Sequence, residues 1–365
     1  MNIFDKIKQF LNGHPEKVKI GKKYVGPGEP VFVIAEVGIN HNGDMEIAKK
    51  LIDVARDSGA DAVKFQKRTT KEILTKEGLD KPYTSPNAFA PTYGAHRDAL
   101  EFNEDQYREL KKYAEKNGVL FFASAWDKGS ADFLESFDVD AYKVPSADTI
   151  NIPLLEYIAK KNKPVLISTG MNTFDEIQDA VSTVLKHNNR VVVFHCLSLY
   201  PSPEHMIELA FMDTLKRTFH PLPVGYSGHE IDLLPTLAAV SRGAVIVERH
   251  LTLDKQMKGS DHAGSLEPHE LKELVDSIRR IEKILGKGGK TMHEELKPLR
   301  DKLAKSVATK RVIKKGEVLT KDMFTIKGPG TGIKPRDMEK LYGLVAEKDL
   351  DEDVIVPVEA LGWKK

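Results

Sequence analysis

Eight short apolar runs, rich in β-forming residues, recur along the chain and alternate with amphipathic stretches of helical period. The runs span residues 32–38, 62–66, 120–125, 141–146, 164–169, 191–196, 223–229 and 245–251. Strands this apolar are typical of parallel sheets that are buried on both faces. Because eight βα repeats close a sheet on itself, the pattern predicts a TIM (β/α)8 barrel. The sequence has neither the GxGxxG turn nor the GxxxxGK[ST] loop that would favour an open nucleotide-binding sheet.

The chain is longer than a barrel alone requires, since it has 365 residues and such barrels have about 250. Residues 17–31 predict a hairpin that covers the N-terminal end of the barrel. Residues 67–103 are too long for a simple βα loop and predict a functional segment over the active face. We expect a barrel domain over 1–285, a polar linker over 286–304 and a small β-rich domain over 305–365.

Charge and cysteine content exclude several classes of protein. Lys and Arg number 55 against 54 Asp and Glu, so we expect no general attraction to nucleic acid or to membranes. The single cysteine, Cys196, excludes an internal disulfide and is typical of a reducing compartment. Residues 1–13 mix charged and apolar side chains, unlike a signal peptide. We therefore expect a cytoplasmic protein.

Polar side chains lie where the predicted strands end, which is where TIM barrels carry their reacting groups. The candidates are Glu36, Lys64, Gln66, Ser124, Lys143, Ser146, Asp148, Ser168, Ser198, Tyr200, Ser227, His229, Glu248, His250 and Asp261. A buried ammonium such as that of Lys64 requires an anionic partner, which is either a structural carboxylate or a ligand. With Lys143 and the nearby hydroxyls, it favours a site for the phosphate and the carboxylate of one small molecule.

Two histidines, His229 and His250, end adjacent predicted strands. Neutral imidazoles with open coordination positions can hold a divalent metal ion, and leave room for water and a substrate oxygen. The alternative is that each is a hydrogen-bonding core residue. Cys196 fits a small apolar strand residue better than a nucleophile.

Several segments, taken together, resemble the sialic acid synthase (N-acetylneuraminate synthase) family. They include FVIAEVGINHNGD, AVKFQ, YKVPSAD, GYSGHE, VIVERHLTLDK and KGSDHAGSLEP. The stretch KSVATKRVIKKGEVLTKDMFTIKGPGTGIKP resembles the antifreeze-like (β-clip) domain of the same family. The resemblance implies a barrel followed by this domain. It also implies a homodimer with exchanged C-terminal domains, in which each small domain reaches the partner's active site.

The resemblance further implies that phosphoenolpyruvate condenses with N-acetylmannosamine and water, with C–O cleavage, to give N-acetylneuraminate and phosphate. Substrate-binding roles fall on Lys64, Gln66, Ser124, Lys143, Ser146, Ser168, Ser198, Tyr200 and Ser227. The resemblance assigns His229 and His250 as ligands of the divalent metal, Mn²⁺ or Mg²⁺. Sugar contacts and proton transfers fall on Glu36, Asp148 and Asp261.

The chain departs from the common bacterial pattern at two positions. Ser198 stands where many members carry Asn, and Gly328 stands where many carry a sugar-contacting Arg. Candidates to replace that Arg are Lys327, Lys334 and Arg336.

The substrate and the enzyme class also have alternatives. YGAHRDALEF and GYSGHE are closer to animal-type members, which use the sugar 6-phosphate. N-acetylmannosamine 6-phosphate, giving the 9-phosphate, and legionaminate- or pseudaminate-type precursors are therefore alternative acceptors. The other classes are a barrel aldolase with a Schiff-base lysine and a non-catalytic sugar- or anion-binding protein.

Overall fold

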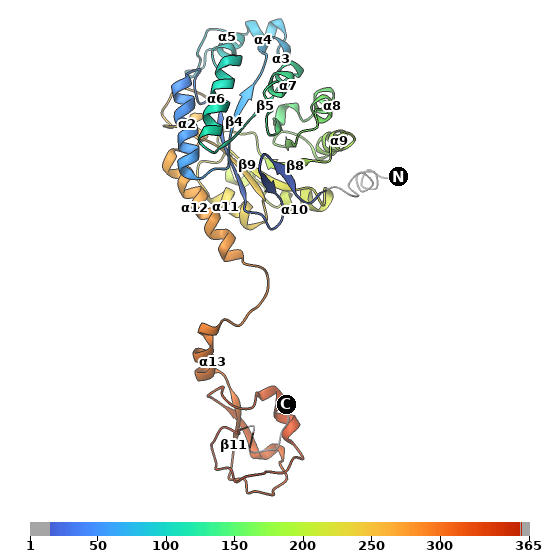
Figure 1. The fold of residues 1–365 in the computed structure, drawn as a ribbon, viewed down its shortest axis with the longest axis vertical. Helices are drawn as coiled ribbons and strands as arrows, with labels where there is room; N and C mark the ends of the chain where they lie inside the picture. Colours follow the sequence, from blue (N-terminus) through green and yellow to red (C-terminus); the bar gives the residue numbers. More distant parts are fainter. Residues whose placement is uncertain (1–14, 358, 360–365) are drawn as a thin grey trace. The chain divides into compact units, whose positions relative to one another are not determined.

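A computed structural model describes residues 15–357 and 359, and the chain divides between Gly286 and Lys287 into two compact units (Figure 1). In the first unit, eight parallel strands close into a barrel in the order β10-β3-β4-β5-β6-β7-β8-β9. The strands are β3 (Phe32–Gly38), β4 (Ala62–Lys67), β5 (Leu120–Ala125), β6 (Tyr142–Val144), β7 (Val165–Ser168), β8 (Val191–Cys196), β9 (Val224–Gly228) and β10 (Ile246–His250). The predicted TIM barrel is confirmed.

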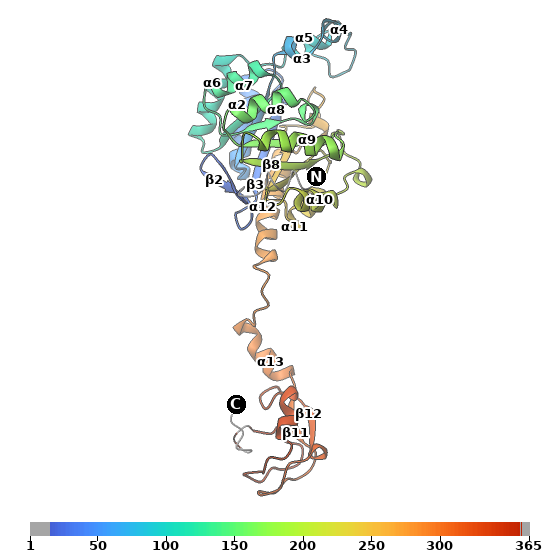
Figure 2. The same cartoon turned by 90° about the vertical axis from the view of Figure 1, so that its right-hand side faces the viewer.

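A helix follows each barrel strand and lies on the outside of the barrel (Figure 2). These helices are α2 (Met45–Ser58), α6 (Glu104–Lys116), α7 (Lys128–Glu135), α8 (Ile152–Lys160), α9 (Phe174–Leu185), α10 (Phe211–Thr218), α11 (Leu234–Ser241) and α12 (Pro268–Leu285). Local sequence sets their ends, as α2 illustrates. The Asp44 carboxylate caps its first turn by accepting from two backbone N–H groups, and Gly59 ends it at a φ of 83°.

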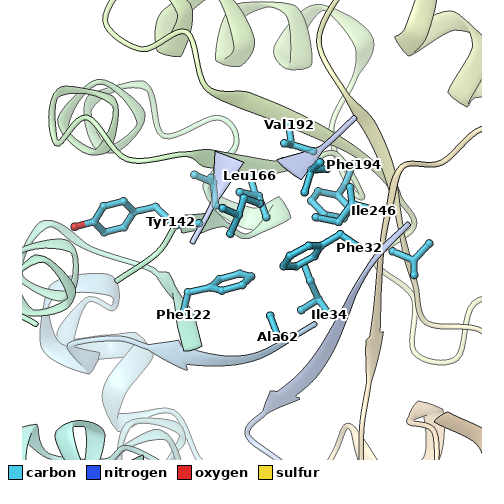
Figure 3. Packing of buried hydrophobic residues seen from close by; sticks show 14 of the residues in the cluster. Phe32, Ile34, Ala62, Phe122, Tyr142, Leu166, Val192, Phe194 and Ile246 are labelled. Atoms are coloured by element: carbon cyan, nitrogen blue, oxygen red, sulfur yellow. The ribbon is translucent and has the colours of Figure 1, made fainter. Parts of the chain in front are cut away.

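The barrel interior is apolar toward the amino ends of the strands and polar toward their carboxyl ends. Figure 3 shows the apolar part, built from Phe32, Ile34, Ala62, Phe122, Leu166, Val192, Phe194 and Ile246. Side chains alternate along a strand, so every second residue faces the axis. Two residues beyond Ile34, Ala62 and Ile246, the same inner face carries Glu36, Lys64 and Glu248 (all three are also buried). The apolar layers therefore support a polar layer at the carboxyl ends of the strands.

A hairpin of β1 (Val18–Ile20) and β2 (Lys23–Val25) precedes the barrel. Lys23 pairs with Asp61, just before β4, and Gly21 packs against the Leu120 side chain at the start of β5. The hairpin therefore lies at the amino end of the barrel, where the sequence places it.

The long segment 67–103 contains three short helices rather than an open loop. They are α3 (Thr70–Ile73), α4 (Lys76–Asp80) and α5 (Tyr93–Asp98), and Figure 2 shows them grouped together. Within residues 15–357, no helix is long and apolar enough to cross a membrane. The prediction about a signal peptide concerns residues 1–13, which lie outside the described part.

The second unit has its own small core. Strands β11 (Ser306–Thr309) and β12 (Phe324–Lys327) pair antiparallel, and Val307 and Phe324 pack in a cluster with Leu341. The predicted linker over 286–304 contains helix α13 (Lys297–Leu303), which follows a 3-10 turn at Glu294–Leu296. The Asp301 carbonyl of α13 accepts a hydrogen bond from the Gly330 N–H at 2.7 Å, so this helix belongs to the second unit.

Candidate active site

A cavity of about 230 Å³ opens at the carboxyl ends of the barrel strands. It is lined by all but one of the predicted site residues, namely Glu36, Lys64, Gln66, Ser124, Lys143, Ser146, Ser168, Ser198, Tyr200, Ser227, His229, Glu248, His250 and Asp261. Parallel strands of a closed barrel bring their carboxyl ends to one face, which is why residues far apart in sequence meet here.

Four buried charged groups form what we call the charged floor: Glu36, Lys64, Lys143 and Glu248. Lys64 Nζ lies 2.5 Å from Glu36 Oε2 and 3.7 Å from Glu248 Oε1. Lys143 Nζ lies 3.1 Å from the same Glu248 oxygen. Glu248 thus connects the two ammonium groups, while its Oε2 is buried and has no hydrogen-bond partner among the residues that the structure describes.

The two carboxyl groups of the charged floor differ in pKa. Burial raises the pKa of Glu36 to about 7, because it outweighs the opposing attraction of Lys64. Burial also disfavours the Glu248 carboxylate, but Lys143 and Lys64 outweigh it and lower the pKa of Glu248 to about 2. Burial lowers the pKa of Lys143. Glu248 is therefore a fixed anion near neutral pH, whereas Glu36 can take up or release a proton.

Hydroxyl groups surround the two ammonium groups. Lys64 donates to Ser124 Oγ at 3.0 Å, and Lys143 donates to Ser168 Oγ at 2.7 Å. Ser227 Oγ donates to Glu248 Oε1 at 3.1 Å. Ammonium and hydroxyl donors on one wall can bind an oxyanion through charge-assisted hydrogen bonds.

The loop after β7 approaches this layer closely. The Gly170 N–H donates to Ser146 Oγ at 3.0 Å, and a Cβ at Gly170 would lie 2.3 Å from Ser198 Oγ. Only a residue without a side chain leaves room for both hydroxyls at this position.

His229 and His250 lie side by side, with ring centroids 5.4 Å apart. His229 Nδ1 lies 2.7 Å from the Leu197 carbonyl, so it carries the proton and leaves a lone pair on Nε2. His250 Nδ1 is buried, has no hydrogen-bond partner within the described part of the chain, and lies 3.9 Å from Asp261 Oδ2. Burial lowers the pKa of His229 to about 3 and that of His250 to about 4, so both rings are neutral at neutral pH. The Tyr200 ring packs 4.0 Å from the His229 ring.

The histidine pair fits an open metal site rather than a closed one. Among the described residues, no group of three or more His, Cys, Asp or Glu side chains is arranged to hold a metal ion. Two neutral imidazoles, one with an orphaned ring nitrogen, suit a divalent cation that completes its coordination with water and substrate oxygens. Metal dependence stays a prediction.

Asp148 is the one predicted site residue that the structure does not bring into the cavity. It lies in a 3-10 turn (Ser146–Asp148), its carboxylate accepts from Asn151 Nδ2 at 3.1 Å, and it lines a separate cavity with Asp127. β6 ends at Val144, so the alternation of a strand does not extend to Asp148. The tight turn directs Ser146 and Asp148 to different cavities.

The cavity also has walls that sequence reasoning did not assign. They include Arg97, Trp126, Met171 and Ser260. The only sequence feature that pointed to Arg97 was the unusual length of segment 67–103, in which it lies.

A closed barrel with two buried lysines and two neutral histidines at its carboxyl face is typical of an enzyme active site. A model described as the NeuB family matches residues 51–290, and a model of the SAF domain matches residues 304–359. The chain belongs to the NeuB family. This confirms the family identified from the sequence motifs and the predicted small C-terminal domain.

Named relatives agree with this placement. Human N-acetylneuraminate-9-phosphate synthase is 42% identical, over 91% of this chain and 92% of the human protein. The N,N'-diacetyllegionaminic acid synthase of Campylobacter jejuni is 38% identical, over 89% of this chain and 98% of its own. A crystal structure of N-acetylneuraminic acid (sialic acid) synthetase from Leptospira borgpetersenii in complex with citrate has a TM-score of 0.70 at 34% identity, and the match covers 78% of this chain and 94% of that one. The predicted enzyme class, an N-acetylneuraminate synthase-type enzyme, is confirmed.

Proposed function

We propose that this enzyme condenses phosphoenolpyruvate with N-acetylmannosamine, free or phosphorylated, and with water, releasing inorganic phosphate and an N-acetylneuraminate-type acid. The convergence of Lys64, Lys143 and several serine hydroxyls beside His229 and His250 carries the proposal. The names of the relatives support it, because they are synthases of sialic and legionaminic acids.

Phosphoenolpyruvate carries a phosphate and a carboxylate, and the floor offers donors for both. Lys64 with Ser124 and Lys143 with Ser168 form two ammonium–hydroxyl pairs. Each pair can bind one oxyanion. We assign further contacts on the substrates to Gln66, Ser146, Ser198, Tyr200 and Ser227, all of which line the cavity.

In the reaction, C3 of phosphoenolpyruvate forms a bond to the aldehyde carbon, and the aldehyde oxygen gains a proton. Water adds to the cationic C2 and loses a proton, after which the C2–O bond to phosphate breaks as the new C2 hydroxyl loses its proton and becomes the keto group. Glu36 suits the proton transfers, since its pKa of about 7 lets it hold or release a proton at neutral pH. Asp261, beside His250, is assigned to the acceptor hydroxyls.

A divalent cation, Mn²⁺ or Mg²⁺, belongs to the proposal. When bound to His229 and His250, it supplies Lewis-acid polarisation of the aldehyde oxygen. Exhaustive chelation should abolish phosphate release, and added Mn²⁺ should restore it. Activity that survives chelation would contradict the metal assignment.

We also propose a homodimer with exchanged C-terminal domains. Large apolar side chains are exposed in the loops that follow β6 to β9, at Ile150, Met171 and Ile231. Leucines are exposed along α13, at Leu296, Leu299 and Leu303. Exposed apolar groups of this size favour burial against a partner. Light scattering should give about twice the chain mass of 40.8 kDa, and a monomer at assay concentration would contradict the dimer.

The decisive assay is phosphate release from phosphoenolpyruvate with Mn²⁺ and each acceptor. We expect release only when both substrates are present, and we expect Lys64→Met to abolish it while the protein stays folded. Release without an acceptor, or undiminished in Lys64→Met, would contradict the proposal. Borohydride with a keto acid distinguishes the aldolase alternative, for which a trapped lysine adduct is expected.

A further inference from the structure

Arg97 on α5 lines the upper wall of the cavity and has no carboxylate partner among the described residues. Its Nε and Nη2 donate to the Tyr93 hydroxyl at 3.0 and 2.5 Å, and the guanidinium carbon lies 4.9 Å from the centre of the Tyr93 ring. The nearby carboxylate of Glu101 is paired instead with Lys67 and Arg68. Tyr93 therefore fixes the orientation of Arg97 without neutralising its charge.

Arg97 and Glu36 line the same cavity, and polar contacts lead from Glu36 toward Arg97. Gln66 Nε2 donates to Glu36 Oε1 at 3.2 Å, and Gln66 Oε1 accepts from Arg68. The charge of Arg97 is close enough to Arg68 to act with burial in lowering the pKa of Arg68. A second positive region, made of Arg68 and Arg97, thus follows the charged floor, and the Gln66 side chain lies between Glu36 and Arg68.

The two regions differ in what they can attract. In the floor, each ammonium already has a carboxylate within 3.1 Å. Arg97 forms no ion pair and its Nη1 amino group has no hydrogen-bond partner among the described residues, while the Asp261 carboxylate lines the same cavity and acts on the neighbouring Arg68. A sugar hydroxyl would gain one neutral hydrogen bond there, whereas a phosphate dianion would gain charge-assisted ones.

We propose that Arg97 binds a phosphate group carried by the acceptor sugar, so that the preferred acceptor is an N-acetylated hexosamine phosphate and not the free sugar. This inference rests on the proposed condensation and names its acceptor. Arg97 is then a specificity-determining residue, and phosphoenolpyruvate occupies the charged floor.

The test compares Arg97→Gln with Lys258→Gln. Lys258 is a matched control because it is an exposed cation that packs over the Phe89 ring and does not line the cavity. Phosphate release is measured with N-acetylmannosamine 6-phosphate and with N-acetylmannosamine, and KM is determined for phosphoenolpyruvate and for each acceptor. A melting curve of each variant confirms that it is folded.

We expect wild type to prefer the 6-phosphate. Arg97→Gln should raise KM for the 6-phosphate roughly 10- to 100-fold, the range for one charge-assisted contact, affect the free sugar far less, and leave KM for phosphoenolpyruvate unchanged. Arg97→Lys, which keeps the charge but loses the planar fork, should show a smaller loss. Lys258→Gln should behave as wild type.

Three results would overturn the proposal. Equal losses with both acceptors, or a raised KM for phosphoenolpyruvate, would mean that Arg97 does not read the acceptor phosphate. Wild-type activity on the free sugar alone would overturn the Arg97 assignment and leave the condensation intact. No phosphate release with any acceptor would overturn both.

Discussion

Glu248 is the residue that joins the two lysines of the charged floor. One of its oxygens lies 3.1 Å from Lys143 Nζ, 3.7 Å from Lys64 Nζ and 3.1 Å from Ser227 Oγ. The sequence predicts the lysines, because a buried ammonium needs an anion, but it does not say which acid supplies it. That choice depends on side chains from β4, β6 and β10 meeting at the barrel axis, which only the closed barrel determines.

Glu248→Gln should destabilise the folded protein by about 3–5 kcal/mol, because it leaves a buried ammonium pair short of one carboxylate. The oxyanions of phosphoenolpyruvate would approach the same ammonium groups. The deficit in melting temperature relative to wild type should therefore shrink when phosphoenolpyruvate is added. An unchanged melting temperature would contradict the role assigned to Glu248.

Glu36→Gln tests the raised pKa of Glu36. The folded-state pKa is about 7 against an ordinary value of 4.5, so the folded protein holds this proton more tightly than the unfolded chain does. The stabilisation that the Glu36 carboxyl contributes is fully present below pH 4.5 and is lost as the pH rises through about 7.

The neutral amide of the variant does not titrate, so the stability of Glu36→Gln relative to wild type should rise between acidic and mildly alkaline pH. Urea unfolding of both proteins across this range measures it. A difference that does not change with pH would contradict the prediction.

At the scale of elements, closure of the barrel depends on Gly225 in β9. A Cβ there would lie 2.4 Å from Ile246 Cγ2 and 2.7 Å from the Ile246 carbonyl oxygen in β10. Gly225→Ala should therefore destabilise the barrel by about 1–3 kcal/mol, the range for overpacking. Gly289→Ala, at a position with nothing within 4 Å of the added carbon, is the control. Equal unfolding free energies for the two variants would contradict this account.

The elements themselves were largely predictable, because alternation and helical period are local. The eight predicted runs coincide with the eight barrel strands, and the hairpin lies where 17–31 places it. The structure departs from the predictions where a local pattern changes. Pro145 follows the end of β6, and the 3-10 turn after it removes Asp148 from the cavity. Leu296, Leu299 and Leu303 have helical spacing inside the stretch that composition alone assigns to a linker.

At the scale of the whole molecule, the connection between the two units is exposed along its length. Residues 286–293 have no regular structure and are exposed, and they include Lys287 and Lys290. Brief trypsin treatment should cleave there first and yield two fragments that resist further digestion, because each unit has its own core. Mass spectrometry of the fragments locates the cut. Initial cleavage inside 67–103 would contradict this prediction.

The charged floor also affects how the enzyme responds to high salt concentration. Since each ammonium group already has a carboxylate neighbour, chloride or another monovalent anion gains little by entering. A ligand that presents several negative charges at once, at the spacing of the two lysines, can compete with these internal carboxylates. The pocket should therefore resist inhibition by common salts while still admitting a multiply charged metabolite, and its selectivity would come from the carboxylates as much as from the lysines.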